Sequence, residues 1–288
     1  MKPAPFTYHD PKTVAEATEM LGTLENARVL AGGQSLMPMM NFRYVMPDHV
    51  IDINKIASLG YIKREGDTLA FGAMTRQRDI EFSDEVKALC PVITEALTHV
   101  GHRQTRNRGT IGGSLCHMDP SAELAAVTAL LDGTLTASTK GGERRIAMAD
   151  FGQGFMSTAL TEQEMLTAIH VPLWPKGHGY AYEEFARRHG DFAIAASGAM
   201  IEMAGGTIKR ASIVVSGVRP NPVRLTAAEK LLVGQKPSDA LAEAAGVEAT
   251  KIDAMSDAYV TAEYRKHLGG VMVKRALKRA FARALEGK

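Results

Sequence analysis

Two glycine pairs, one near residue 32 and one near residue 112, limit most strongly what this chain can fold into. They lie in Ala31-Gly32-Gly33-Gln34-Ser35-Leu36 and in Thr110-Ile111-Gly112-Gly113-Ser114-Leu115. Neither segment has the Gly-Lys-Ser/Thr of a P-loop or the G-x-G-x-x-G of a Rossmann dinucleotide site. Consecutive glycines can reach positive φ, and successive N–H groups can then form a nest that binds a phosphate. Each pair alone is typical of a structural hinge, but two such pairs indicate a nucleotide cofactor held between separate loops.

Composition excludes several classes of protein. The chain has 288 residues, of which 45% are hydrophobic and 23% charged, and its net charge is +2. These values are those of a globular protein with no general nucleic-acid footprint. The apolar runs fall far short of the roughly 20 residues that span a membrane, and the N-terminus lacks the apolar region of a secretory signal. We therefore expect a cytoplasmic location.

Two cysteines, Cys90 and Cys116, restrict the redox chemistry. An iron–sulfur cluster normally takes four thiolates, so such a cluster would have to lie on another chain. Cys116 and His117 are adjacent, and in an extended segment they would point to opposite faces, which argues against a catalytic pair. No spacing of histidines or cysteines indicates a metal site. We expect no catalytic side chain and no metal ligand in this chain.

Secondary-structure patterns predict an α+β protein with two domains. Thr13 and Glu16 form a capping-box pattern before the first helix. Strands near residues 28–30, 49–53 and 68–72 precede a helical region at 76–100 in two pieces and a polar, glycine-punctuated stretch at 101–113. Residues 121–131 predict a buried helix with Ser121 as its N-cap.

The C-terminal part has a different composition. Pro, Gly and His cluster at residues 172–179, and beyond them three strands predict a meander with a type I′ turn at Gly205-Gly206. Helices follow, and basic residues of the last helix predict a solvated face. Glu183 and Glu184 are likewise expected at the surface. The pattern predicts domains 1–176 and 177–288, with the first divided into two α/β subdomains near residues 55–60.

Several longer motifs extend over nearly the whole chain in a fixed order. They are Phe6-Thr7-Tyr8-His9-Asp10-Pro11, Ala31-Gly32-Gly33-Gln34-Ser35-Leu36-Met37-Pro38, Arg106-Asn107-Arg108-Gly109-Thr110-Ile111-Gly112-Gly113, Asp119-Pro120-Ser121-Ala122-Glu123, Gly190-Asp191-Phe192-Ala193 and Glu263-Tyr264-Arg265 with Arg275-Ala276-Leu277. In these motifs the chain resembles the FAD-binding medium subunits of the aerobic carbon monoxide dehydrogenase and N-heterocycle molybdenum hydroxylase family, and the FAD domain of xanthine dehydrogenases.

The resemblance implies a non-Rossmann FAD fold of the vanillyl-alcohol-oxidase type, followed by a C-terminal domain with the meander and helices. It implies that both glycine segments hold the FAD pyrophosphate. We expect this binding to be noncovalent, because of the two glycine nests and because no histidine or cysteine stands at an evident attachment position. Glu123 corresponds to an acidic residue that faces ribityl or ribose hydroxyls, Leu166 to a backbone contact with the flavin, and Phe192 to a position beside the isoalloxazine ring. That last position is often tyrosine in the family, so a phenolic hydroxyl is missing here. The full set of expected cofactor-binding residues is Gly32, Gly33, Gln34, Ser35, Leu36, Thr110, Ile111, Gly112, Gly113, Ser114, Glu123, Leu166 and Phe192.

The function implied is that of an oxidoreductase subunit that carries electrons. A molybdenum cofactor on a large partner would oxidise the substrate, and [2Fe-2S] clusters on a small partner would pass electrons to this FAD and on to an external acceptor. A dimer of such heterotrimers is expected. The substrate would be determined by the large partner. The alternatives are a self-contained flavin oxidase or reductase, and an assembly subunit that has lost FAD.

Overall fold

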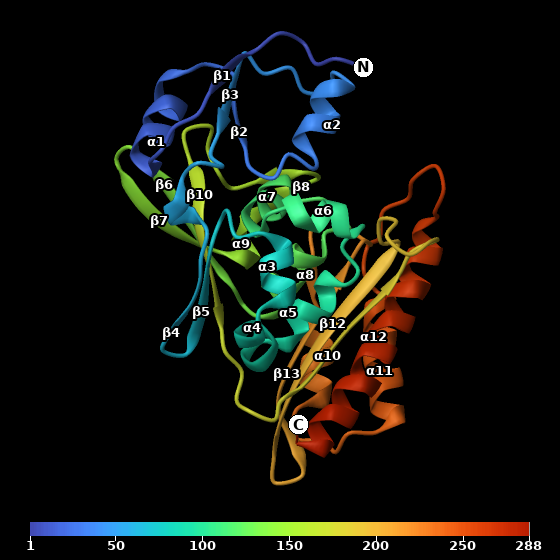
Figure 1. The fold of residues 1–288 in the computed structure, drawn as a ribbon. Coiled ribbons are helices and arrows are strands. Elements are labelled where there is room, and N and C mark those ends of the chain that lie inside the picture. The colour runs from blue at the N-terminus through green and yellow to red at the C-terminus, as the bar shows by residue number, and fades with distance from the viewer. Residues whose placement is uncertain (288) are drawn as a thin grey trace.

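The computed structural model describes residues 1–287 of the chain, which form four β-sheets with helices packed against the three largest (Figure 1). The N-terminal sheet is parallel, with the order β1-β3-β2. Its strands and flanking helices are β1 (Thr7–His9), α1 (Val14–Thr23), β2 (Ala27–Leu30), α2 (Leu36–Asn41), β3 (His49–Asp52) and the 3₁₀ turn η1 (Ala57–Leu59). The capping box is confirmed, because Glu16 N–H donates to Thr13 Oγ1 and Glu16 Oε2 accepts from Thr13 N–H.

A five-stranded antiparallel sheet with the order β4-β5-β10-β6-β7 follows. Its strands are β4 (Ile62–Glu65), β5 (Thr68–Gly72), β6 (Thr134–Thr139), β7 (Gly142–Ala147) and β10 (Met165–Pro172). Helices and a small hairpin lie between them: α3 (Gln77–Phe82), α4 (Asp84–Leu89), α5 (Pro91–Leu97), α6 (Arg103–Arg108), α7 (Ile111–His117), α8 (Glu123–Leu130), α9 (Met148–Phe151), β8 (Gly152–Gly154) and β9 (Ser157–Thr158).

Four sequence predictions for this middle part are wrong. The helical region 76–100 forms three helices, α3 to α5. The second glycine segment, residues 110–115, is not a loop, because α7 begins at Ile111. Ser121 is not an N-cap, since α8 begins after Ala122 and the Ser121 hydroxyl donates to the Ala193 carbonyl at 2.9 Å. Cys116 and His117 lie on α7 rather than in an extended segment, so the argument from opposite faces of a strand does not apply to them.

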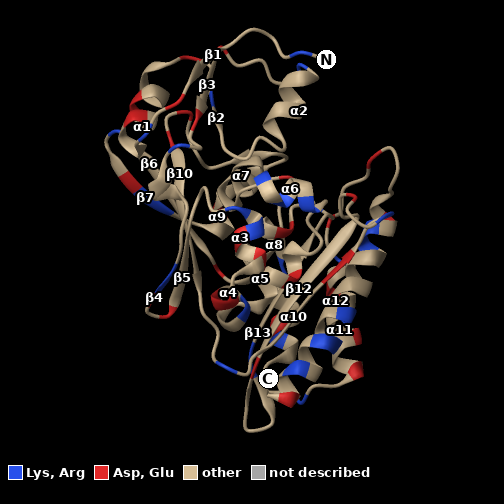
Figure 2. Cartoon of the chain, in the orientation of Figure 1, with Lys and Arg blue, Asp and Glu red and all other residues tan. Residues whose placement is uncertain are grey.

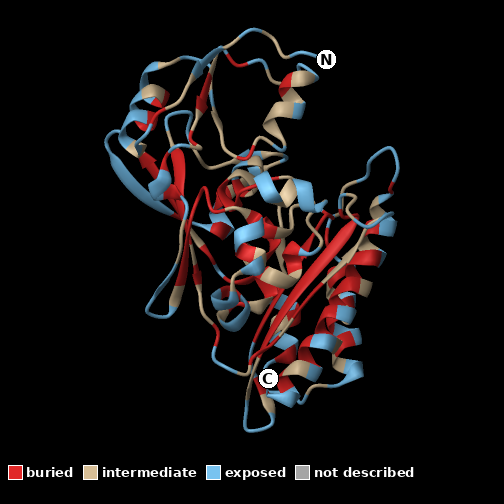
Figure 3. Ribbon diagram, viewed as in Figure 1, coloured by how far each residue is buried: buried red, intermediate tan, exposed pale blue. Residues whose placement is uncertain are grey.

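The C-terminal sheet is an antiparallel meander with the order β11-β12-β13-β14, one strand more than predicted. Its strands and following helices are β11 (Gly179–Phe185), β12 (Ala195–Ala204), β13 (Thr207–Ser216), β14 (Val223–Arg224), α10 (Thr226–Leu232), α11 (Asp239–Ala249) and α12 (Ala262–Glu286). Gly205 and Gly206 have φ of 57° and 79°, the geometry that a type I′ turn requires. Helix α12 packs on one face of this sheet and α8 on the other, so β12 is buried on both (Figure 3).

The basic residues of α12 are mostly paired rather than simply solvated. Lys274 and Lys278 pair with acidic residues of α11, and Arg279 and Arg283 both pair with Glu95 of α5. Figure 2 shows the positions of basic residues in blue and acidic residues in red along the ribbons of α11 and α12. These ion pairs join the last helix to its neighbours and leave no long basic stripe there.

Within residues 1–287, three groups of buried apolar residues form the interior. One lies around α1 and β3, one around α5, α7, α8 and the five-stranded sheet, and one between the C-terminal sheet and α10 to α12. The second group also takes in Tyr182, Ala196, Met200 and Val214 from the C-terminal sheet. The mixed helix and sheet fold is confirmed. No helix within residues 1–287 combines the length and apolar character that a membrane span needs.

Candidate functional site

The first glycine segment leaves the end of β2 and enters α2 with its backbone donors free. Gly33 has φ of 74°, which a side chain rarely tolerates. Within the described chain, no group accepts a hydrogen bond from the backbone N–H of any residue from 32 to 36. The Ser35 side chain makes no capping bond to α2. Five consecutive free N–H groups, with a hydroxyl beside them, form a donor set suited to an anion.

The second glycine segment is built differently, and the predicted nest is wrong there. Neither Gly112 nor Gly113 has positive φ, and both lie in the first turn of α7. Gly112 N–H donates to the Ala73 carbonyl at 2.9 Å, and Gly113 N–H donates to Thr110 Oγ1 at 3.0 Å, where Thr110 is the N-cap. A methyl group at Gly112 would lie 2.6 Å from Ala73. Close packing, rather than free donors, explains this glycine.

The fold brings the two segments into contact. A methyl group on Gly32 would lie 2.3 Å from the Arg108 carbonyl oxygen, so only glycine allows this approach. One on Gly113 would lie 3.5 Å from the Ala31 Cβ. Residues that lie 76 and 82 positions apart in the sequence are therefore in contact in the structure.

Asn54 and Arg76 hold this arrangement, and sequence reasoning missed both. Asn54 Nδ2 donates to the Ala31 carbonyl at 2.8 Å, and Asn54 Oδ1 accepts from Arg76 Nη2 at 2.6 Å. Arg76 also donates to the Arg108 carbonyl and forms a β-bridge with Thr110. The pair thus connects the two glycine segments. A polar residue directly after a buried strand was the only signal for Asn54 in the sequence.

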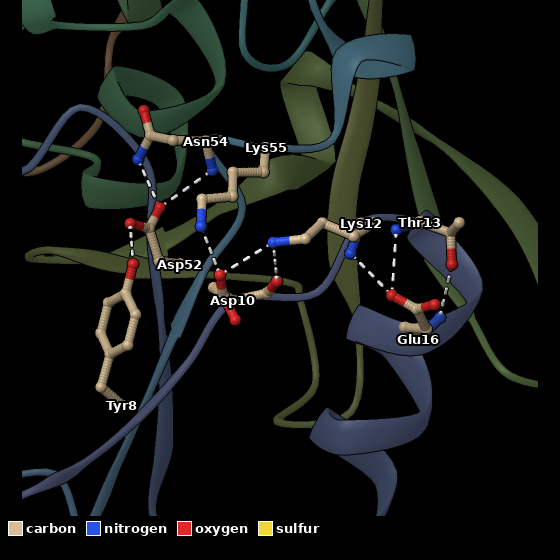
Figure 4. Close-up of polar contacts among 8 residues, drawn as sticks. All are labelled: Tyr8, Asp10, Lys12, Thr13, Glu16, Asp52, Asn54 and Lys55. Atoms are coloured by element: carbon tan, nitrogen blue, oxygen red, sulfur yellow. Dashed lines mark hydrogen bonds and ion pairs between the residues drawn. The ribbon is translucent and has the colours of Figure 1, made fainter.

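Asp52 fixes the orientation of Asn54 from the end of β3. Its Oδ1 accepts from the Asn54 backbone N–H at 2.9 Å and from the side-chain amide, and its Oδ2 accepts from the Tyr8 hydroxyl at 2.7 Å (Figure 4). Hydrogen bonds from Asn54 and Tyr8 outweigh desolvation, the largest single effect, and lower the pKa of Asp52. An ionised Asp52 is a strong acceptor for both.

Glu123, Leu166 and Phe192 lie on three different elements. Glu123 is the first residue of α8, and burial raises its pKa to about 7. Leu166 is buried in β10, beside a bulge in its pairing with β6 and in the same apolar group as α7. Phe192 is 79% exposed on the connection between β11 and β12. The Ser121 bond to Ala193 holds this connection beside the start of α8.

The Phe192 connection is anchored at two further points. Gly190 is in such close contact with His102, at the start of α6, that a methyl group there would lie 2.6 Å from its ring. The buried Arg265 of α12 donates to the Ile194 carbonyl at 2.9 Å and to the Gly217 carbonyl at 2.6 Å, and pairs with Asp257. A cavity of about 670 Å³ lies away from the glycine segments, between the end of α8 and residues 219–224. None of the expected cofactor-binding residues lines it.

Comparisons with known proteins identify the family of this chain. Residues 4–174 match the family model described as FAD binding domain in molybdopterin dehydrogenase, and residues 180–280 match the CO dehydrogenase flavoprotein C-terminal domain. The chain belongs to the FAD-binding medium subunits of the molybdenum hydroxylases. The resemblance noted in the sequence is thus confirmed, together with the assignment as an oxidoreductase subunit.

Individual relatives cover nearly the full chain. The carbon monoxide dehydrogenase medium chain of Afipia carboxidovorans is 40% identical and covers 99% of both chains. The caffeine dehydrogenase subunit beta of a Pseudomonas species is 37% identical over 98% of this chain and 97% of its own. A solved structure of reconstituted CO dehydrogenase from Oligotropha carboxidovorans superposes with a TM-score of 0.96 at 40% identity, covering 98% of this chain and 100% of that one.

Proposed function

We propose that this medium subunit holds FAD noncovalently, with the cofactor pyrophosphate at the contact between the two glycine segments. The observation that carries the proposal is the run of five free N–H groups from Gly32 to Leu36, placed directly against the start of α7. A pyrophosphate accepts several hydrogen bonds from such a backbone concavity without needing a buried lysine. The hydroxyls of Ser35, Thr110 and Ser114 would add donors.

The second segment contributes shape rather than backbone donors. Gly112 and Gly113 allow α7 to pack against Ala73 and Ala31, so the start of the helix lies against the first segment. Ile111 is buried and fixes the first turn of the helix in the core. Gln34 is exposed and donates back to the Gly32 carbonyl at 3.2 Å, so it stiffens the first segment.

Three further residues would orient the rest of the cofactor. Glu123 would accept hydrogen bonds from ribityl or ribose hydroxyls, and the Leu166 backbone would contact the flavin. Phe192 would lie beside the isoalloxazine ring, and its exposure of 79% in the chain leaves its face open for that contact. A flavin exchanges either one or two electrons, so the bound cofactor connects one-electron clusters to a two-electron acceptor.

The finer fold assignment also remains our proposal. We infer a vanillyl-alcohol-oxidase-type FAD fold at residues 1–176, divided near residues 55–60, and a C-terminal domain at 177–288. The separate apolar group around α1 and β3 supports the division within the first part. The limits of the two family models, 174 and 180, support the boundary between the domains.

We further propose a small iron–sulfur partner and a large molybdopterin partner, assembled as a dimer of heterotrimers in the cytoplasm. Only two cysteines are present, too few for the four thiolates of a cluster. Relatives across the whole length are named as medium chains or subunits of dehydrogenases, which supports an obligate complex.

Replacing Gly33 with valine tests the FAD site. The valine is strained by about 1–3 kcal/mol at φ of 74° and crowds Leu30 and Met37 at 3.3 Å. We expect the complex with Gly33→Val to purify with little FAD. Gly66→Val is the matched control, because Gly66 has φ of 62° but nothing within 4 Å of the added carbon. Full FAD content in the Gly33 variant would show that this segment is only a hinge.

A further inference from the structure

A group of buried polar side chains lies on the face of the C-terminal sheet that α5 covers at β11 and α8 covers at β12 and β13. Tyr182 and Glu184 point to this face from β11, because alternate residues of a strand share a side. In the register of the sheet, Glu184 pairs with Ala196, which pairs with Ser216 of β13, so these three residues form one row. Tyr182 begins the neighbouring row, opposite Gly198.

One of these polar atoms, Glu184 Oε2, is buried without a hydrogen-bond partner in the described part of the chain. The hydroxyls of Tyr182 and Ser216 are buried near each other, and hydrogen bonding by Ser216 acts to lower the pKa of Tyr182. Buried polar groups are nearly always paired, so the unpaired Glu184 oxygen marks a place with a role beyond packing. Glu183 behaves differently, because it points to the opposite face and forms an ion pair with Arg279 of α12.

The surroundings of Glu184 favour the protonated form of its carboxyl group. Burial, and then the negative charge of Glu123, raise the pKa of Glu184 to about 8. Burial and the charges of Glu123 and Glu184 raise the pKa of Tyr182 well above its ordinary value. Two carboxyl groups in a low-dielectric place do not ionise together easily.

The other charged groups that face this pair do not neutralise it. Asp119 raises the pKa of Glu123 further, and Arg106 lowers it. Arg106 itself is held by Glu81 through two hydrogen bonds of 2.8 and 3.0 Å. At neutral pH the protonated carboxyl of Glu184 therefore lies close to a partly ionised Glu123.

The carboxyl pair of Glu123 and Glu184 lies next to residues that are expected to contact the cofactor. Glu123 is a predicted FAD contact at the start of α8, and Glu184 is the second-last residue of β11, just before the connection that carries Phe192. We propose that Glu184 is a proton-accepting group of the flavin site, which above about pH 8 binds a proton from water when electrons reach the flavin. This inference rests on the proposed function.

The step balances simply. When the partner's iron–sulfur clusters pass two electrons to the bound FAD, the carboxylate of Glu184 would take one proton from solvent, and this proton would offset one of the two added negative charges. The added negative charge raises the pKa of Glu184. Proton uptake therefore occurs at pH values that lie between the pKa of Glu184 before reduction and its higher pKa after reduction. Below pH 6 the carboxyl is protonated in both states and takes up nothing.

Redox titration of the FAD in the purified complex tests this coupling. One proton taken up per two electrons changes the midpoint potential by about 30 mV per pH unit. We expect the native complex to show a steeper slope than Glu184→Gln above pH 8, by up to that amount, and an equal slope below pH 6. Glu183→Gln is the matched control, because it removes the same charge from the other face, and its slope should equal the native one.

Infrared difference spectra give a second readout that does not depend on activity. At pH 8.5, reduction of the native complex should produce a protonated carboxyl band and remove a carboxylate band, and Glu184→Gln should lack both changes. Should the glutamine variant fail to fold, Glu184→Asp retains a carboxyl group and should retain the band. Identical slopes for native and Glu184→Gln complexes, or a native spectrum without the band, would overturn the inference. A complex that contains no FAD at all would instead overturn the proposed function, and this inference with it.

Discussion

Glu184→Gln should make the chain more stable at neutral pH, by an amount that depends on pH. The pKa of Glu184 rises from an ordinary 4.5 to about 8 in the folded chain. A carboxyl group with a raised pKa binds its proton more tightly in the folded chain than in the unfolded one. Its contribution to the free energy of unfolding is therefore complete below pH 4.5 and declines as the pH rises towards 8. Each pH unit in that window lowers the free energy of unfolding by about 1.4 kcal/mol.

The magnitude follows from this window. Between acidic pH and pH 7, the free energy of unfolding of the native chain falls by about 3 kcal/mol because of Glu184. The variant with the neutral glutamine does not undergo this loss. The stability difference between variant and native chain should therefore widen by about 2–3 kcal/mol between pH 5 and pH 7. Any difference in packing between the two side chains is nearly the same at both pH values, so the comparison cancels it.

Urea unfolding, followed by circular dichroism at pH 5, 6, 7 and 8, measures this difference. Glu183→Gln is again the control, and it should lower stability because it removes the ion pair with Arg279. A Glu184 difference that stays constant from pH 5 to pH 8 would show that this carboxyl is solvated and ionised in the folded chain. The reasoning about buried charge would then be wrong.

Three other predictions follow from the site. Asn54→Ala should lower FAD content in the purified complex, because it releases the Ala31 carbonyl and Arg76; normal content would show that the pair is not needed for positioning. Arg265→Met should destabilise the chain by about 2–5 kcal/mol, since it leaves two buried carbonyls without a donor, and a change below 1 kcal/mol in urea unfolding would contradict this. Acid precipitation should release all flavin into the supernatant, whereas yellow precipitate would indicate a covalent bond.

The elements that the sequence predicted correctly are those with local causes. The capping box of α1 depends on residues three positions apart, and the Gly205-Gly206 turn depends on two adjacent residues with positive φ. The apolar stripe of α12 is long enough to show its period clearly, and its members Val273, Leu277 and Phe281 are buried. Each of these patterns can be recognised without knowing which distant residues pack against the element.

The elements that it missed depend on distant contacts. Helices α6 and α7 have six and seven residues, too short to be stable alone, and two glycines lower the helix propensity of α7. Tertiary contacts supply what the local sequence lacks, such as the bond from Gly112 to Ala73. The Asn54–Arg76 connection joins residues 22 positions apart and has no pattern of its own.

Similar sequence patterns therefore have different physical meanings in the two glycine segments. Gly33 needs positive φ and stands among free donors, whereas Gly112 needs space for Ala73 and donates its own N–H within the fold. The same distinction applies to the pair Glu183 and Glu184, where alternation along the strand predicts opposite directions but not what covers each face. Because α12 covers one face and α8 the other, Glu183 forms an ion pair with Arg279, whereas Glu184 lies near the carboxyl group of Glu123. The chemistry of both pairs is determined by the neighbours that the fold brings to them.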